Sequence, residues 1–155
     1  RSGMLLIGEP AAKKANPQNT VDGQFSGPFV VACALATGQM SWDSYQRLND
    51  PTIRALLPKI TCQEDPELPN MAAKLTIQTR GATRTKLVTT PKGEPGNFLT
   101  EQELRAKFHS LTDLILGADR ADLLANTVLT LHEASDLSTL HRYAAPVTPK
   151  IRLAG

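Results

Sequence analysis

The sequence has no apolar stretch that approaches the ~20 residues needed to span a bilayer. Its most apolar segment, residues 29–36, is too short for that and lacks the flanking residues of a signal peptide. We therefore expect neither a membrane span nor a membrane partner.

The chain also lacks an excess of charge of one sign. Its 17 Lys and Arg residues against 15 Asp and Glu residues give a formal net charge of +2 over 155 residues. Nucleic-acid-binding proteins usually gather basic residues on one face or in runs, and the nearest approach here is Lys13 with Lys14. We interpret that pair as part of a solvated loop and expect no nucleic-acid partner.

Cysteine is scarce, since Cys33 and Cys62 are the only two. They fall in different predicted elements, and no Cys-x-x-Cys or Cys/His spacing indicates zinc, so we expect no metal site. Cys33 lies in an apolar run and is expected to be buried as a small hydrophobic residue. A disulfide between the two is left open, and the pattern favours a reducing, cytoplasmic compartment.

Self-contained catalytic motifs are missing too. The Gly-rich residues 93–96 contain Pro and lack the Lys-Ser/Thr of a phosphate-binding loop, and no Gly-x-Ser-x-Gly sequence occurs. Three histidines are present, but none pairs with a carboxylate at a spacing that indicates a general base and its orienting group: His109, His132 and His141. We therefore find no complete active site from residue types alone.

Two weaker features could bind an anion. Ser26 with Gly27 opens a predicted helix, where free N–H groups and the helix dipole favour a carboxylate or phosphate; a plain N-cap is the alternative. Arg84 and Lys86 share one face of a predicted strand, for which a solvated sheet face is the more ordinary interpretation. Neither feature fixes a function.

The clearest structural signal is a helix over residues 26–38. Ser26 is a good N-cap, Pro28 suits the first turn, and Gly38 ends the run. The residues between are almost wholly apolar, which predicts a helix buried on all sides that forms the spine of its domain.

The remaining pattern predicts an α+β fold for residues 1–95, a helical segment over 98–142 and a tail over 143–155. The breaker-rich residues 91–97 form the boundary. Thr100 and Glu103 match a capping box that opens the helical segment. The other expected elements are a short strand at 4–7, a loop over 8–23, helices from Ser41 and from Thr52, strands at 59–63, 73–79 and 83–90, a helix from Asp119, and a short last helix after Ser135 and Asp136.

Two stretches carry a resemblance to a known family. Residues 20–35 read TVDGQFSGPFVVACAL, and residues 91–95 (PKGEP) are followed at 99–108 by LTEQELRAKF. In this order they resemble segments of the MmgE/PrpD family, and the resemblance covers about residues 17–142. It implies a small α+β lid domain in residues 1–95, followed by carboxy-terminal helices that pack on a large helical domain.

The resemblance also implies a partial protein. The chain opens with Arg1-Ser2-Gly3 and no initiator Met, and we expect a fragment whose amino-terminal helical domain is absent and would be its partner. Family members include 2-methylcitrate dehydratase and cis-aconitate decarboxylase. They act on small di- or tricarboxylates without a metal or organic cofactor, and most are homodimers.

The family's catalytic residues are expected mostly in the absent part, so an isolated fragment is expected to be inactive. For substrate binding the resemblance points to Gln24, Ser26 and Phe29, and Phe29 replaces a Tyr found in some members, which removes a phenolic proton donor. The alternative is a non-catalytic remnant, or an association or ligand-binding module of the same fold.

Overall fold

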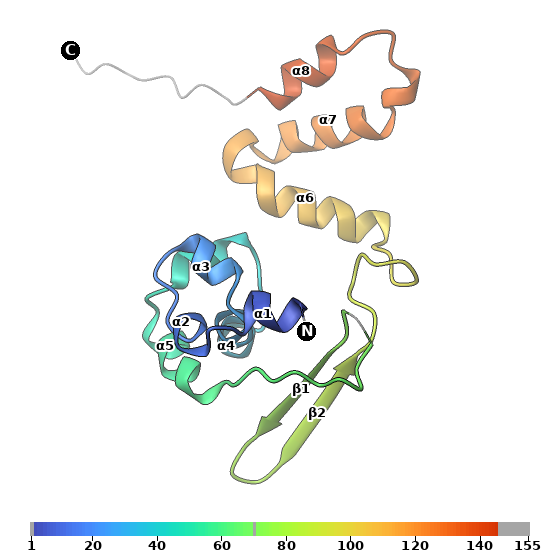
Figure 1. The fold of residues 1–155 in the computed structure, drawn as a ribbon. Coiled ribbons are helices and arrows are strands. Elements are labelled where there is room, and N and C mark those ends of the chain that lie inside the picture. Colours follow the sequence, from blue (N-terminus) through green and yellow to red (C-terminus); the bar gives the residue numbers. More distant parts are fainter. Residues whose placement is uncertain (1, 70, 146–155) are drawn as a thin grey trace, which may run out of the picture. The chain divides into compact units, whose positions relative to one another are not determined.

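The computed structural model describes residues 2–69 and 71–145. The chain forms two compact units, with the boundary between Phe98 and Leu99. The first unit contains, in chain order, helices α1 (Ser2–Ile7), α2 (Ala11–Lys14), α3 (Thr20–Gln24) and α4 (Gly27–Thr37), the 3-10 helix η1 (Trp42–Arg47), α5 (Pro51–Leu56), the 3-10 helix η2 (Leu57–Lys59), and strands β1 (Ala73–Gln78) and β2 (Thr83–Val88) (Figure 1). The α+β class with antiparallel strands is confirmed, whereas the role of residues 1–95 as a lid stays a prediction.

Helix α4 has the ends that its sequence predicts. The Ser26 hydroxyl accepts a hydrogen bond from the Phe29 amide at 3.0 Å, which satisfies one of the free N–H groups of the first turn. At the other end Gly38 adopts a left-handed conformation (φ +77°) that a side chain would disfavour.

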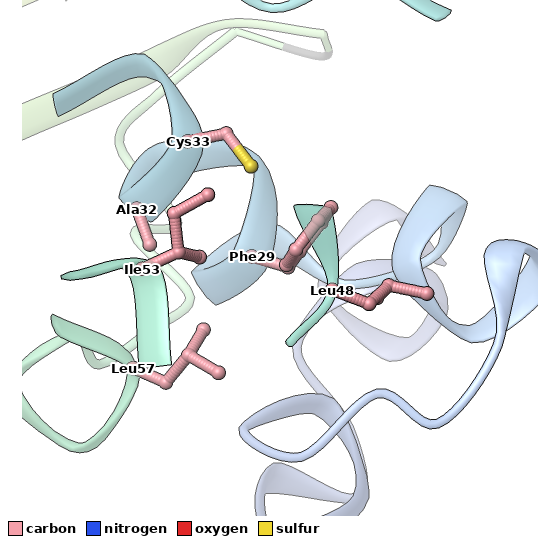
Figure 2. Packing of buried hydrophobic residues seen from close by; sticks show 6 residues of the cluster. All are labelled: Phe29, Ala32, Cys33, Leu48, Ile53 and Leu57. Carbon is pink, nitrogen blue, oxygen red and sulfur yellow. The ribbon is translucent and has the colours of Figure 1, made fainter. Parts of the chain in front are cut away.

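The core of the first unit forms where α4 meets α5. Phe29, Ala32 and Cys33 of α4 pack with Ile53 of α5 and with two leucines that flank that helix, Leu48 and Leu57 (Figure 2). The carboxy-terminal end of α4 is open, because Ala34, Leu35 and Ala36 are exposed and Leu35 retains 44% of its accessible surface. The prediction that α4 is buried on all sides is therefore wrong for the described chain.

The two strands form an antiparallel hairpin, in which Leu75 lies opposite Lys86 and Ile77 opposite Arg84. Nearly every side chain on the hairpin is exposed, with Ile77 half-buried. The predicted strand at 59–63 is wrong: η2 runs to Lys59, and the chain after it has no regular structure. A strand needs a neighbour for its backbone groups, and alternating polarity does not supply one.

The amino-terminal predictions also need correction. Residues 4–7 lie in helix α1 rather than in a strand, and the expected loop at 8–23 contains α2 and most of α3. The Asn19 side chain caps α3 by accepting from the Asp22 amide at 2.9 Å. Arg54 holds the preceding loop, because its guanidinium donates to Asn16 Oδ1 at 2.7 Å and to the Pro17 carbonyl at 2.9 Å.

The second unit consists of α6 (Glu101–Leu116), α7 (Ala118–Leu129), the 3-10 helix η3 (Leu131–Glu133) and α8 (Ser138–Ala144). The predicted capping box is confirmed: Glu103 N donates to Thr100 Oγ1, and Thr100 N donates to Glu103 Oε2. Residues 146–155, most of the predicted tail, lie outside the described residues. Among the helices that the structure describes, none is both long and apolar enough to cross a membrane.

Candidate functional site

Ser26, the central residue of the predicted substrate-binding segment, is fully buried between α3 and α4. Its hydroxyl donates to the Lys14 carbonyl at 2.5 Å and accepts from the Phe29 amide at 3.0 Å. The single hydroxyl proton is thus already engaged, and a direct contact with a substrate carboxylate would need the α2 segment to move. In this arrangement Ser26 joins α2 to the start of α4.

Phe29 and Gln24 lie in different surroundings. Phe29 has no exposed surface and stacks on the Tyr45 ring with 6.1 Å between ring centroids, so it belongs to the core. Gln24 ends α3 and is half-buried. The three predicted residues are therefore near one another in the chain but do not converge on one cavity, and their role as substrate contacts stays a prediction.

A shallow hollow of about 200 Å³ lies beside this segment and is lined by residues of α1, α2 and α3 and of the turn after α3: Leu6, Lys13, Lys14, Val21, Asp22 and Phe25. Lys14 Nζ donates to the Leu6 carbonyl at 2.6 Å and lies 6.0 Å from the Phe25 ring centroid. Lys13 Nζ lies 3.8 Å from Asp22 Oδ1. Two ammonium groups against one carboxylate leave the hollow with an excess of positive charge.

The interpretation of Lys13 and Lys14 as a solvated loop is correct for the exposed Lys13 side chain and wrong for the loop and for Lys14. Both residues lie in the last turn of helix α2, and Lys14 is half-buried. An apolar wall from Leu6, Val21 and Phe25 with ammonium groups at its rim suits a small organic anion. Lys14 and Ser26 are only twelve residues apart in the sequence, which makes a contact between them feasible. Their residue types do not indicate that contact, so the sequence analysis did not predict the hollow.

A second, wider hollow carries the opposite charge. Its volume is about 730 Å³, and its lining comes from the first helix, the turn after it and the irregular chain after η2: Met4, Leu5, Glu9, Pro10, Cys62, Gln63 and Glu64. Burial raises the pKa of the Cys62 thiol, and burial likewise raises the pKa of Cys33. Both thiols are free and favour the protonated form, so neither is activated as a nucleophile.

His109 has carboxylate partners that the sequence analysis did not recognise. Its Nδ1 lies 2.8 Å from Asp113 Oδ1, one turn along α6, and its Nε2 lies 3.2 Å from Asp122 Oδ1 on α7. The prediction that no histidine pairs with a carboxylate is therefore wrong. Both ring nitrogens are engaged, so His109 offers no nitrogen for general-base catalysis.

The remaining candidates are dispersed. Arg84 and Lys86 lie on exposed strand β2, as expected for a solvated sheet face. Within residues 2–69 and 71–145, no three His, Cys, Asp or Glu side chains gather closely enough to hold a metal ion. The hollow at Lys13 and Lys14 is thus the feature of this part of the chain best suited to a small anionic ligand.

Comparisons with known proteins agree with the residue pattern at 20–35 and 91–108. The family model of the MmgE/PrpD C-terminal domain matches residues 1–133. A cis-aconitate decarboxylase-like protein of Aspergillus oryzae is 26% identical over 137 residues, which cover 83% of this chain and 28% of that protein. The cis-aconitate decarboxylase of Mus musculus is 26% identical over 133 residues, covering 81% of this chain and 27% of the mouse protein. The chain thus spans little more than a quarter of the length of these relatives.

Proposed function

Because this chain belongs to the MmgE/PrpD family through its carboxy-terminal domain, we propose that it is the carboxy-terminal part of a lyase that acts on a small di- or tricarboxylate. The reaction is of the cis-aconitate decarboxylase or 2-methylcitrate dehydratase type and uses no metal or organic cofactor. The observation that carries the proposal is the similarity to two decarboxylase-type relatives over more than four fifths of this chain.

The proposed reaction requires groups that stabilise negative charge on the substrate. Loss of CO2 from a carboxylate, or removal of a proton beside one, builds negative charge that cationic groups or N–H donors must stabilise. The hollow at Lys13 and Lys14 supplies cationic groups against an apolar wall. Ser26 supports that hollow, because its hydroxyl holds the Lys14 carbonyl. Gln24 and Phe29 enter the proposal as residues of the same segment, with Gln24 half-buried at the end of α3 and Phe29 in the core.

The acid and base of the reaction come from outside this chain. In the described residues His109 has both ring nitrogens engaged, and the Cys33 and Cys62 thiols favour their protonated forms. We propose that the amino-terminal helical domain of the whole protein supplies the acid and base, that the whole protein is a homodimer, and that it works in the cytoplasm. The 155 residues alone are then inactive.

The test is proton NMR of cis-aconitate and of 2-methylcitrate, each incubated with the longest natural protein that contains these residues and, separately, with this chain alone. Turnover by the long protein only is the expected result, and the product identifies the reaction. Turnover by the isolated 155 residues would contradict the dependence on an absent domain. No turnover of either acid by the long protein would contradict the proposed substrate class.

The hollow is tested in the same long protein with Lys14→Gln. We expect a lower kcat/KM, because a cationic group near the substrate is lost, whereas Lys107→Gln on the exposed surface of α6 is the matched control. Equal kinetics for the two variants would remove the hollow from the proposed site and leave the lyase assignment intact.

A second candidate function is a non-catalytic association module. The observation that favours it is a set of exposed apolar side chains on α6 and α7, among them Leu111, Leu114, Ile115 and Leu123. Such surface in a soluble protein usually marks a contact with another protein. Light scattering of the isolated chain tests this candidate: a monomer at high concentration would argue against a self-association surface.

A further inference from the structure

The His109 imidazole contacts one carboxylate on each of the first two helices of the second unit. Nδ1 is 2.8 Å from Asp113 Oδ1 on the same helix, and Nε2 is 3.2 Å from Asp122 Oδ1 on α7. The His109 side chain retains 23% of its accessible surface, so the cluster is partly shielded while water and protons still reach it.

The number of protons on the ring decides how many of these contacts are hydrogen bonds. An ionised carboxylate only accepts, and a neutral imidazole has one N–H, so a neutral His109 can donate to one of its two aspartates. The other ring nitrogen would then direct a lone pair at a carboxylate oxygen. Only the imidazolium form donates to both helices at once.

Among residues 2–69 and 71–145, His109 is the cation that forms ion pairs with these two carboxylates. Lys107, two residues before His109 on α6, is exposed, and the Arg105 guanidinium donates to Glu101 Oε1 at 2.8 Å and to Asn126 Oδ1 at 3.0 Å. On α7 the Arg120 guanidinium donates to the carbonyls of Tyr143 and Arg142. From α7, Asp122 is the charged group that faces the ring. The edge of the Phe108 ring, with its centroid 6.0 Å from that of the imidazole, adds no charge. His109 is therefore the cation that compensates both aspartates.

We propose that His109 is a proton-operated clamp between α6 and α7: the protonated ring holds both helices, and loss of one proton releases one of the two contacts. Asp113 lies on the same helix as His109 and stays within reach in either state. The contact at risk is that with Asp122, which is also the longer of the two. The α6–α7 pairing thereby becomes sensitive to pH.

The direction of the effect follows from the surroundings of the ring. The hydrogen bond to Asp113, helped by the charges of Asp113 and Asp122, raises the pKa of His109 above its ordinary 6.5, while partial burial opposes this. A raised folded-state pKa means that protonated His109 contributes its full stabilisation below pH 6.5, the unfolded value. That stabilisation is lost as the pH rises through the folded-state pKa.

The first experiment is a long-range proton–nitrogen NMR titration of the histidine rings in the full 155-residue chain. We expect His109 to titrate above 6.5, with both ring nitrogens protonated at low pH. Asp122→Asn should lower its titration midpoint, whereas Asp119→Asn, three residues earlier on α7, is the matched control. A wild-type midpoint at or below 6.5, or equal midpoints in both variants, would overturn the proposal.

The second experiment measures the effect of His109 protonation on the stability of the second unit. A shifted titration of the ring alone would not demonstrate that effect. Urea unfolding is followed by the NMR signals of α6 and α7 amides at several pH values between about 5.5 and 9, a range that begins about one unit below the ordinary histidine pKa. The urea midpoint of the wild type should fall as pH rises, and His109→Gln should remove the histidine-dependent part of that fall. An identical pH dependence in His109→Gln would contradict the clamp.

Discussion

The two units of this chain are stabilised in different ways. In the first, Phe29 and Ile53 are fully buried and Leu57 retains 2% of its surface, so a small apolar core holds α4 against α5. In the second, the most buried large side chains are Leu116 and Leu124, each still 8% exposed. Burial of apolar surface is the main favourable term in folding. The second unit therefore gains less stability from its core than the first.

Polar contacts link the helices of the second unit. The Arg120 guanidinium donates to the Tyr143 carbonyl at 3.0 Å and to the Arg142 carbonyl, which ties α7 to α8. His109 ties α6 to α7. Polar contacts on a protein surface contribute little each, so this unit should gain most from a covering partner.

The largest expected effects come from substitutions that compare how much the buried core of each unit contributes to its free energy of unfolding. Phe29→Ala removes a fully buried ring and should lower the free energy of unfolding of the first unit by about 3–5 kcal/mol. Leu124→Ala should cost the second unit about 2 kcal/mol, the lower end for a buried leucine. Urea unfolding followed by Trp42 fluorescence reports the first unit, and amide NMR signals of α7 report the second.

The exposed ring of Phe98, with 69% of its surface accessible, provides the control. Phe98→Ala should change the unfolding free energy by no more than about 0.5 kcal/mol. An effect of Phe29→Ala as small as that of the control would show that the core around α4 does not determine the stability of the first unit.

A smaller effect is expected at the polar link between α2 and α4. Ser26→Ala leaves the Phe29 amide without its cap and the Lys14 carbonyl without its donor, which should cost about 1–2 kcal/mol. Ser110→Ala on α6 removes a hydroxyl that donates to the Lys107 carbonyl at an exposed position and should cost within about 0.5 kcal/mol. Equal losses in the two variants, measured by urea unfolding, would argue against a special role of the buried Ser26 hydroxyl.

The sequence predicted best those features that depend on a few neighbouring residues. Ser26 and Gly38 cap α4, and Thr100 with Glu103 caps α6, because capping bonds span three or four positions. The prediction failed at 4–7, where a short apolar run suggested a strand, and at 59–63, where apolar alternation did. In the described part of the chain those segments have no strand beside them, and a pairing partner cannot be inferred from local pattern alone.

The candidate site was harder to predict for the same reason. The contact of Ser26 with the Lys14 carbonyl joins two helices, and the link between His109 and Asp122 joins two others. Spacing along one helix could have revealed only the pair His109 and Asp113, four residues apart. The family resemblance pointed to Gln24, Ser26 and Phe29, but not to which of their atoms are buried.

The substitution with the smallest expected effect on the isolated chain tests whether another domain covers the second unit. Leu114 retains 86% of its surface, so Leu114→Ser should change the unfolding free energy of the isolated chain by no more than about 0.5 kcal/mol. In the longest natural protein the same change should cost about 2 kcal/mol or more if the proposed amino-terminal helical domain packs on α6. Gln102→Ala, on the same helix, is the control in both proteins. Equal small effects of Leu114→Ser in the two proteins would mean that this face of α6 stays open to solvent and would contradict the packing of the proposed amino-terminal domain on it.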